Sequence, residues 1–475
     1  MSTVALIESS GLRRLRSRGQ YVALSHCWGG LLPLVLTTHN IDTLKDAINL
    51  SQLPKTFQDA IALTRFMQVR YLWIDSLCII QDSHTDWEFE ASTMKDVYKH
   101  AVFTIAATGA RNSGDGLYFD RDVDLVGAVT LPVCWQGLPR GIYSICEDRL
   151  WLDNVTDAPL NQRAWVIQER LLSCRTLHLG RDQIAWECQT LQACETFPAR
   201  LPLKCSDYED FAFRTKLANA PLKMVGRIWD NTAETYSRGR LTEETDKCIA
   251  ISGIVEEMQL ATADHYFAGL WGSSFVLQMC WTVHHLKNVR DRQTPRRPRR
   301  YRAPSWSWLS IDSNVQFYSI YDNIYDILFE VLNVNIKNTG RNNFGSIKGG
   351  CIVGRGLLKS ALWEHSTDDR VGHLQIDDES IQHGSFWNYG GSTHVTMDLG
   401  LEEKCDSVWC LPLVRNSDEY NVGTVTRCIV GVLLVPTGQA EEEYKRVGCF
   451  RLEDDLGKSL FKEYTDGPHH SFTIV

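Results

Sequence analysis

Apolar runs alternate with amphipathic segments over the first hundred residues. The runs cover residues 21–25, 71–80 and 102–107, and the first one closes at Gly29-Gly30, as a buried strand does at a turn. Between them, apolar positions recur at helical spacing over residues 57–67, after the candidate cap Thr56, and over about 86–100. This β-α-β-α-β series predicts an α/β core, a parallel sheet with flanking helices.

After the first hundred residues the pattern becomes mixed and then, in the last third of the chain, typical of β-strands. Its middle mixes short strands with helices, with Trp229 and Tyr236 as expected core anchors, and alternation predicts strands over 408–414, 428–435 and 446–452. Seven Arg and two Pro between residues 290 and 302 indicate a solvated connection, with an anion-binding patch as the alternative. We therefore expect a core over 1–120, a mixed α/β extension packed on it over 121–289, an Arg/Pro-rich loop over 290–302 and a β-rich region over 303–475.

Composition excludes several classes of protein. The 475 residues are 44% hydrophobic and 23% charged, which is the balance of a globular protein, and a net charge of −9 offers no global field for nucleic acid. No apolar stretch is long enough for a membrane span. The 15 cysteines are an odd count without a CxxC pair, which indicates reduced thiols, and their spacing predicts no metal site.

The carboxyl ends of the predicted strands supply the candidate site residues. In open parallel sheets ligands bind at this edge, which here gathers residues 25–29, either Asp75-Ser76 or residues 81–83, and Thr108-Gly109. Asp75 interrupts an apolar run, so its carboxylate needs a partner, which could be a ribose hydroxyl, a helix N-terminus or a basic side chain. We predict Asp75 as a catalytic residue, and the expected ligand-binding residues are Ser25, Trp28, Gly29 and Ser76.

Glu90 is the second predicted catalytic residue. On a helical projection from Trp87 it falls inside the apolar stripe that contains Met94 and Val97. A carboxylate on a core-facing stripe loses hydration and has a raised pKa unless it is paired. The structural alternative is an ion pair with one of three arginines, Arg65, Arg70 or Arg163.

Two further groups have open interpretations. Cys27 beside His26 suggests a thiolate with an imidazole partner, but adjacent strand residues point to opposite faces, so a structural role is preferred and the pair stays an alternative catalytic assignment. Glu169 and Arg170 lie on a predicted helix, where they either clamp the core to the middle region or add a second carboxylate to the site.

These motifs together resemble the heterokaryon incompatibility (HET) domain of filamentous fungi. The matching segments are residues 21–29, 53–61 and 70–82, and Asp86-Trp87 with Glu90, Met94 and Tyr98. Residues 163–173, 186–188 and 304–308 are similar to segments that usually follow the domain.

The resemblance implies a cytoplasmic fungal protein of non-self recognition that triggers cell death, alone or with incompatibility partner proteins. HET domains are also similar to TIR domains, which implies a flavodoxin-like core and NAD as a substrate, with Glu90 near the position of the TIR glutamate but three residues after its Trp where the TIR pattern has four. No cofactor is required in this hypothesis, which makes the chain an NAD nucleosidase acting after self-association. The alternatives are a non-enzymatic signalling module and a small-molecule enzyme of secondary metabolism.

Overall fold

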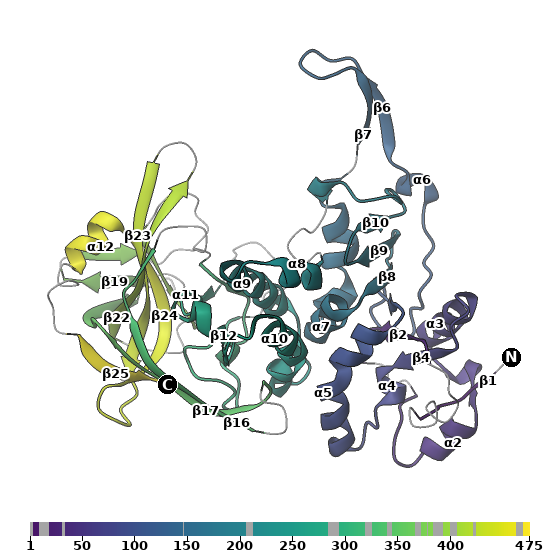
Figure 1. The fold of residues 1–475 in the computed structure, drawn as a ribbon, viewed down its shortest axis with the longest axis horizontal. Helices are drawn as coiled ribbons and strands as arrows, with labels where there is room; N and C mark the ends of the chain where they lie inside the picture. Colours follow the sequence, from purple (N-terminus) through teal and green to yellow (C-terminus); the bar gives the residue numbers. More distant parts are fainter. Residues whose placement is uncertain are drawn as a thin grey trace. The chain divides into compact units, whose positions relative to one another are not determined.

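The computed structural model divides the chain into two compact units (Figure 1). Unit 1 comprises Met1–Asn219 with Gly239–Leu241, and unit 2 comprises Ala220–Arg238 with Thr242–Val475. The structure describes residues 3–8, 19–30, 34–145, 147–205, 212–283, 294–318, 325–339, 344–365, 372–377, 379–382, 393–399, 406–420, 424–461 and 469–475.

Unit 1 is built around a six-stranded sheet with the order β10-β9-β8-β5-β2-β4. Its strands are β2 (Tyr21–Ser25), β4 (Tyr71–Ile74), β5 (Thr104–Ala106), β8 (Arg175–Leu179), β9 (Ile184–Cys188) and β10 (Gln192–Cys194). The pairs β2/β4, β2/β5 and β5/β8 are parallel, whereas β8/β9 and β9/β10 are antiparallel. The sheet as a whole is therefore mixed.

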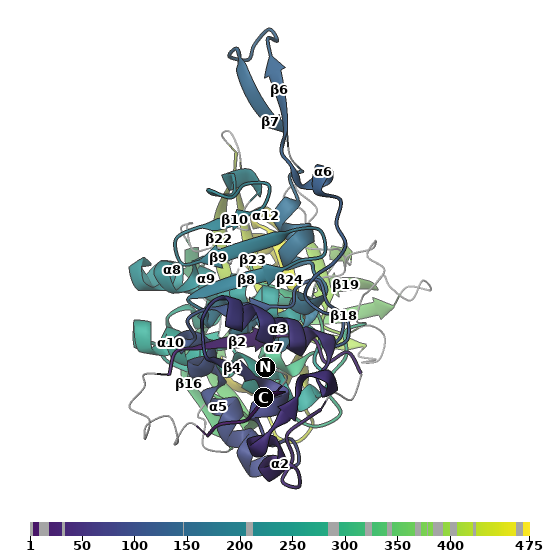
Figure 2. The same ribbon diagram turned by 90° about the vertical axis from the view of Figure 1, so that its right-hand side faces the viewer.

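Smaller elements complete unit 1. Its helices are α2 (Ile41–Asp46), α3 (Lys55–Phe66), α4 (Asp75–Cys78), α5 (His84–His100), α6 (Val123–Val126), α7 (Ala164–Leu172) and α8 (Phe213–Asn219). Two short strands, β1 (Thr3–Val4) and β3 (Ile48–Asn49), pair with each other. A second pair, β6 (Val129–Val133) and β7 (Gly141–Ile145), forms a hairpin that projects beyond the central sheet of unit 1 (Figure 2).

The helices cover both faces of β2. Val22 and Leu24 join a core cluster with Phe57 of α3, whereas Ala23 packs with Met94 and Tyr98 of α5. This alternation follows from the two-residue period of a strand. It sends successive residues at the carboxyl end of β2 to opposite faces of the sheet.

One predicted element is wrong. Residues 77–80 were expected to extend the second strand, but the strand ends at Ile74 and α4 begins at Asp75. Here the chain leaves the sheet for one helical turn, in which the Asp75 carboxylate accepts a hydrogen bond from the backbone N–H of Ser76 at 2.7 Å. Asp75-Ser76, rather than residues 81–83, therefore marks the carboxyl end of β4.

Unit 2 combines helices with a large sheet. Its helices are α9 (Leu222–Arg238), α10 (Ile249–Thr262), α11 (Phe275–Gln278) and α12 (Asp454–Leu460). The main sheet contains β15 (Tyr325–Ile327), β16 (Glu330–Asn338), β17 (Ile347–Gly356), β18 (Lys359–His365), β19 (Gly372–Ile376), β20 (Glu379–Gln382), β21 (His394–Met397), β22 (Ser407–Tyr420), β23 (Thr424–Pro436), β24 (Glu443–Glu453) and β25 (His470–Ile474). Two short antiparallel pairs join β11 (Tyr266–Phe267) to β12 (Leu270–Trp271) and β13 (Thr282–Val283) to β14 (Val315–Gln316).

The predicted β-rich carboxyl part and the mixed α/β composition are confirmed. The strands expected over 408–414, 428–435 and 446–452 lie within β22, β23 and β24. Trp229 and Tyr236 are fully buried, as expected of core anchors, in an aromatic cluster with Trp271 and Trp308. Within the ranges described above, no helix has the length and apolar character to span a bilayer.

Candidate functional site

Asp75 lies at the rim of the sheet, where β4 ends. Its carboxylate accepts hydrogen bonds from the Trp28 indole N–H at 2.9 Å and from the Ser76 backbone N–H at 2.7 Å. Its side chain is 18% exposed. The partners of this interrupting carboxylate are therefore neutral N–H donors, and part of it stays open to solvent.

His26 approaches the same carboxylate from β2. Its Nδ1 lies 3.6 Å from Asp75 Oδ1, its side chain is 1% exposed, and its ring meets the Phe57 ring edge-on at 4.9 Å. Burial lowers the pKa of His26, with Asp75 acting against this and Arg163 adding to it. Neither ring nitrogen has a hydrogen-bond partner among the residues that the structure describes. His26 is therefore a neutral imidazole with an open proton-accepting nitrogen.

Glu169 adds a second carboxylate to this cluster from α7. It is 4% exposed, and burial raises its pKa, while Arg163, Ser25 and Tyr98 favour the ionised form and Asp75 opposes it. Its Oε2 meets no partner at hydrogen-bonding geometry within the described part of the chain. The charge of Asp75 therefore acts on Glu169.

Arg163 is the cation of the cluster. It sits at the amino end of α7, and its guanidinium donates a hydrogen bond to the backbone carbonyl of His26. Its charge favours the ionised form of Glu169 and disfavours a protonated His26. Arg163 therefore connects α7 to the end of β2.

Four buried side chains around this rim have unpartnered polar atoms, with Ser25 and Glu169 on one face of β2 and His26 on the other. They are Ser25, His26, Ser76 and Glu169, each with at least one polar atom that lacks a hydrogen bond within the described residues. Burying a polar group without a partner costs roughly 1–3 kcal/mol. We refer to these four residues together with Asp75 as the rim cluster, since they can offer hydrogen bonds to a polar ligand or to water.

Gly29 and Cys27 shape the turn after β2. Gly29 has a φ of +67°, and a Cβ placed there would lie 2.1 Å from Asn112 Cβ, so no other residue fits without displacement. Cys27 packs with Leu160 and Val166 on the face opposite to His26, and burial raises its pKa. The thiol is therefore protonated at neutral pH and has no imidazole base.

Glu90 lies apart from the rim cluster. It is half-buried, and its pKa is raised by burial and by Asp86, with Thr93 acting against this. In the described part of the chain no ion pair joins Glu90 to an arginine and no contact joins it to Asp75. Cys78 lies close enough to both acids to feel their charges: burial raises its pKa, and Asp75 and Glu90 raise it further.

Arg170 belongs to a neighbouring buried network whose members all lie in the predicted middle region. Its guanidinium donates to Glu187 Oε2 at 2.7 Å and Oε1 at 3.1 Å, and His178 Nε2 lies 3.3 Å from Oε2. Burial raises the pKa of Glu187, but Arg170 and His178 outweigh this and hold it well below its usual range. Arg170, Glu187 and Cys188 also line a shallow pocket. This network ties α7 to β8 and β9 within unit 1.

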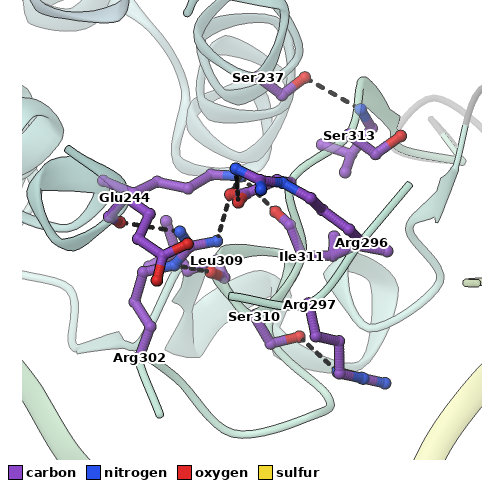
Figure 3. Close-up of polar contacts among 12 residues, drawn as sticks. Ser237, Glu244, Arg296, Arg297, Arg302, Leu309, Ser310, Ile311 and Ser313 are labelled. Atoms are coloured by element: carbon purple, nitrogen blue, oxygen red, sulfur yellow. Dashed lines mark hydrogen bonds and ion pairs between the residues drawn. The ribbon is translucent and has the colours of Figure 1, made fainter. Parts of the chain in front are cut away.

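The arginine-rich segment of unit 2 is described from residue 294, and Arg296, Arg299 and Arg300 are exposed in it. Arg302 is buried and donates to the carbonyls of Leu309 at 2.7 Å and Glu244 at 2.8 Å and to Asp312 at 2.7 Å (Figure 3). Burial and Arg302 lower the pKa of the adjacent Lys247 to about 7. These groups are engaged with one another, so Arg302 anchors the loop. The arginines at 290 and 292 lie outside the described residues.

Sequence reasoning located the rim but not all of its members. Ser25, Trp28, Gly29, Asp75 and Ser76 lie where expected, whereas Tyr98 and Arg163 had no predicted place in the site and Glu169 was one of two interpretations. The sequence does contain a sign that Glu169 is buried, because this acidic residue lies between the apolar pairs Val166-Ile167 and Leu171-Leu172. The described residues contain no group of three or more His, Cys, Asp and Glu side chains that could hold a metal ion.

Comparison with known proteins identifies the region that contains this site. Residues 21–169 match the family model "Heterokaryon incompatibility protein (HET)", from the start of β2 to Glu169. Neither a curated protein nor a solved structure matches the chain. The matched segment includes the whole rim cluster together with Trp28, Tyr98 and Arg163. Residues 21–169 of the chain therefore form a heterokaryon incompatibility domain.

Proposed function

We propose that this chain is a fungal effector of non-self recognition and cell death, acting in the cytoplasm, and that its HET domain cleaves NAD or a related nucleotide. The proposal rests on the five residues of the rim cluster, which lie around the carboxyl ends of β2 and β4. Two of them, Asp75 and Glu169, are carboxylates, and all but Asp75 have a polar atom without a hydrogen bond within the described residues. This edge of a parallel strand pair is where α/β folds bind nucleotides. The likeness to TIR and flavodoxin-like domains belongs to the same proposal.

The chemistry assigns a role to each group. Nicotinamide leaves with the electron pair of its bond to the ribose, and the positive charge that develops on the sugar is stabilised by a nearby carboxylate. Asp75 is the member with solvent exposure, so it faces the ribose, with Trp28 and Ser76 fixing its orientation. Water then adds to the ribose carbon, and its proton passes to neutral His26 or to Glu169. The products are nicotinamide, ADP-ribose and one proton.

Glu90 is the alternative charge-stabilising residue. It is half-buried and has a raised pKa, but it lies apart from Asp75 and His26. Two isosteric variants separate the assignments, Asp75→Asn for the rim cluster and Glu90→Gln for α5. Glu88→Gln is the matched control, because Glu88 is exposed on the same helix.

The test is nicotinamide release from NAD by the purified full-length chain at high protein concentration. We expect release by the unmodified chain and by Glu88→Gln, and its loss in Asp75→Asn with an unchanged circular dichroism spectrum. Loss in Glu90→Gln alone would move the chemistry to α5. Equal background in all four proteins would remove the enzymatic proposal.

A non-enzymatic signalling module is the second candidate, favoured by the near-complete burial of His26 and Glu169. In this case the rim cluster is a folding feature, and the domain acts by contact with partner proteins. Expression of Asp75→Asn in a fungal incompatibility assay distinguishes the two, since cell death at the unmodified level supports the signalling module.

A further inference from the structure

The β6–β7 hairpin of unit 1 exposes an unusual amount of apolar surface. Residues 129–145 form a two-stranded arm that projects beyond the central sheet of unit 1 in both views (Figures 1 and 2). The large apolar residues that are 40–79% exposed along it are Val129, Leu131, Trp135, Leu138, Ile142 and Ile145. An isolated two-stranded hairpin is marginally stable in water, so the arm requires a cover.

One face of the arm is continuous and apolar. Val129 stands opposite Ile145, and Leu131 stands opposite Tyr143, so these four side chains share a face. The adjacent pair, Thr130 opposite Ser144, points to the other face. We call the face of Val129, Leu131, Tyr143 and Ile145 the arm face.

The area is that of a small interface. Ile142 stands opposite Pro132 on the other face, and the remaining five residues lie on the arm face or in the connecting loop at the tip. If a fully exposed large side chain offers about 200 Å², these five present about 500 Å² of apolar surface. Each partner in a standard interface contributes about 800 Å², so we expect a weak dimer. Monomers seldom expose a patch larger than roughly 300–600 Å².

The charges along the arm favour a second copy of this chain as the binding partner, packed antiparallel to the first. Arg140 is exposed at the tip, whereas Glu147 and Asp148 are exposed at the base. A second copy placed antiparallel about a two-fold axis sets each Arg140 beside the acids of its partner. A parallel pair would set like charges together.

We propose that the β6–β7 arm is a dimerisation element whose arm face packs antiparallel against the arm face of a second copy of this chain. The contact is independent of the rim cluster, so its failure leaves the proposed chemistry untouched. Loss of NAD cleavage in an intact dimer would, conversely, affect only the proposed function.

The test compares two double variants of the full-length chain by sedimentation velocity over a concentration series. Val129→Asp with Ile145→Asp puts two carboxylates on the arm face, and Thr130→Asp with Ser144→Asp puts the same pair on the opposite face. The second is a matched control for charge and strand propensity. We expect the first to raise the dimer dissociation constant about a hundredfold or more, because it buries unpaired charges. The control should change it by less than about threefold, since its carboxylates stay in water.

Charge reversal tests the antiparallel direction. Arg140→Glu should weaken the dimer, and adding Glu147→Arg with Asp148→Arg in the same chain should restore it. A chain that is monomeric at every concentration, an equal loss in both double variants, or a failure of this restoration would overturn the proposal. Monomers that bind phosphatidylserine vesicles through Trp135 would also overturn it.

Discussion

Two buried glutamates of unit 1 should respond in opposite ways to the same substitution. Glu187 accepts two hydrogen bonds from Arg170, which hold its pKa well below the usual range, whereas burial raises the pKa of Glu169. Glu187→Gln removes the partner of a buried guanidinium, which costs about 3–5 kcal/mol of unfolding free energy. Glu169→Gln removes a charge that the folded state disfavours, so we expect no loss or a gain of stability.

The two pKa shifts also predict opposite effects of pH on the stability of the fold. Glu187 has a lowered pKa in the folded chain, so its contribution is present above its unfolded value of about 4.3 and is lost as pH falls below it. Glu169 has a raised pKa, so it destabilises the fold as pH rises above that value. The difference between the two variants should therefore be largest at neutral pH.

Thermal and urea unfolding of the full-length chain, followed by tryptophan fluorescence, measure this difference. A loss of 3–5 kcal/mol corresponds to a decrease of about 6–20 °C in the melting temperature of a unit of this size. Asp153→Asn is the control, because Asp153 pairs with Arg149 at the surface, where an ion pair contributes about 0–1 kcal/mol. If Glu169→Gln destabilised as much as Glu187→Gln, Glu169 would be a structural anchor and the reasoning about the rim cluster would be refuted.

Three further predictions concern the turn and the end of β2. Gly29→Ala should destabilise unit 1 by about 1–3 kcal/mol in urea unfolding, because it adds a Cβ at positive φ against Asn112, and an unchanged midpoint would contradict this. The pKa of His26 is lowered by burial, so its contribution to stability should be lost as pH falls below about 6.5, and His26→Gln should flatten that decline in melting scans. Cys27 should react with iodoacetamide more slowly than exposed Cys134 in peptide mapping of the native chain, and equal rates would show that the thiol is accessible.

Local patterns predicted the elements but not every boundary. Apolar runs located β2 and β5, and alternation located β22 to β24, because strand periodicity depends on residues that are neighbours in sequence. The same rule failed at Leu77, where an apolar run continues but the chain leaves the sheet. Hydrophobicity does not distinguish a buried strand from a buried helical turn, so the apolar pattern alone does not place the end of the strand at Ile74.

Local sequence patterns also locate only some of the residues of the candidate site. Helical periodicity places Glu90 on the inner face of α5, but it does not say which segment covers that face. Glu169 arrives from α7, about 90 residues after Asp75 in the sequence, and no local pattern encodes this approach. Long-range packing therefore decides which carboxylate joins Asp75.

The most direct test of the rim cluster as a ligand site is the binding of NAD to the full-length chain, measured by calorimetry and by the ligand-dependent melting temperature. A ligand at a hundred times its dissociation constant stabilises the folded state by about 2.7 kcal/mol. We expect the unmodified chain and Glu88→Gln to gain this stabilisation and Asp75→Asn to lose most of it. Equal stabilisation of all three proteins, or none in any of them, would contradict the assignment of the rim cluster as a nucleotide site.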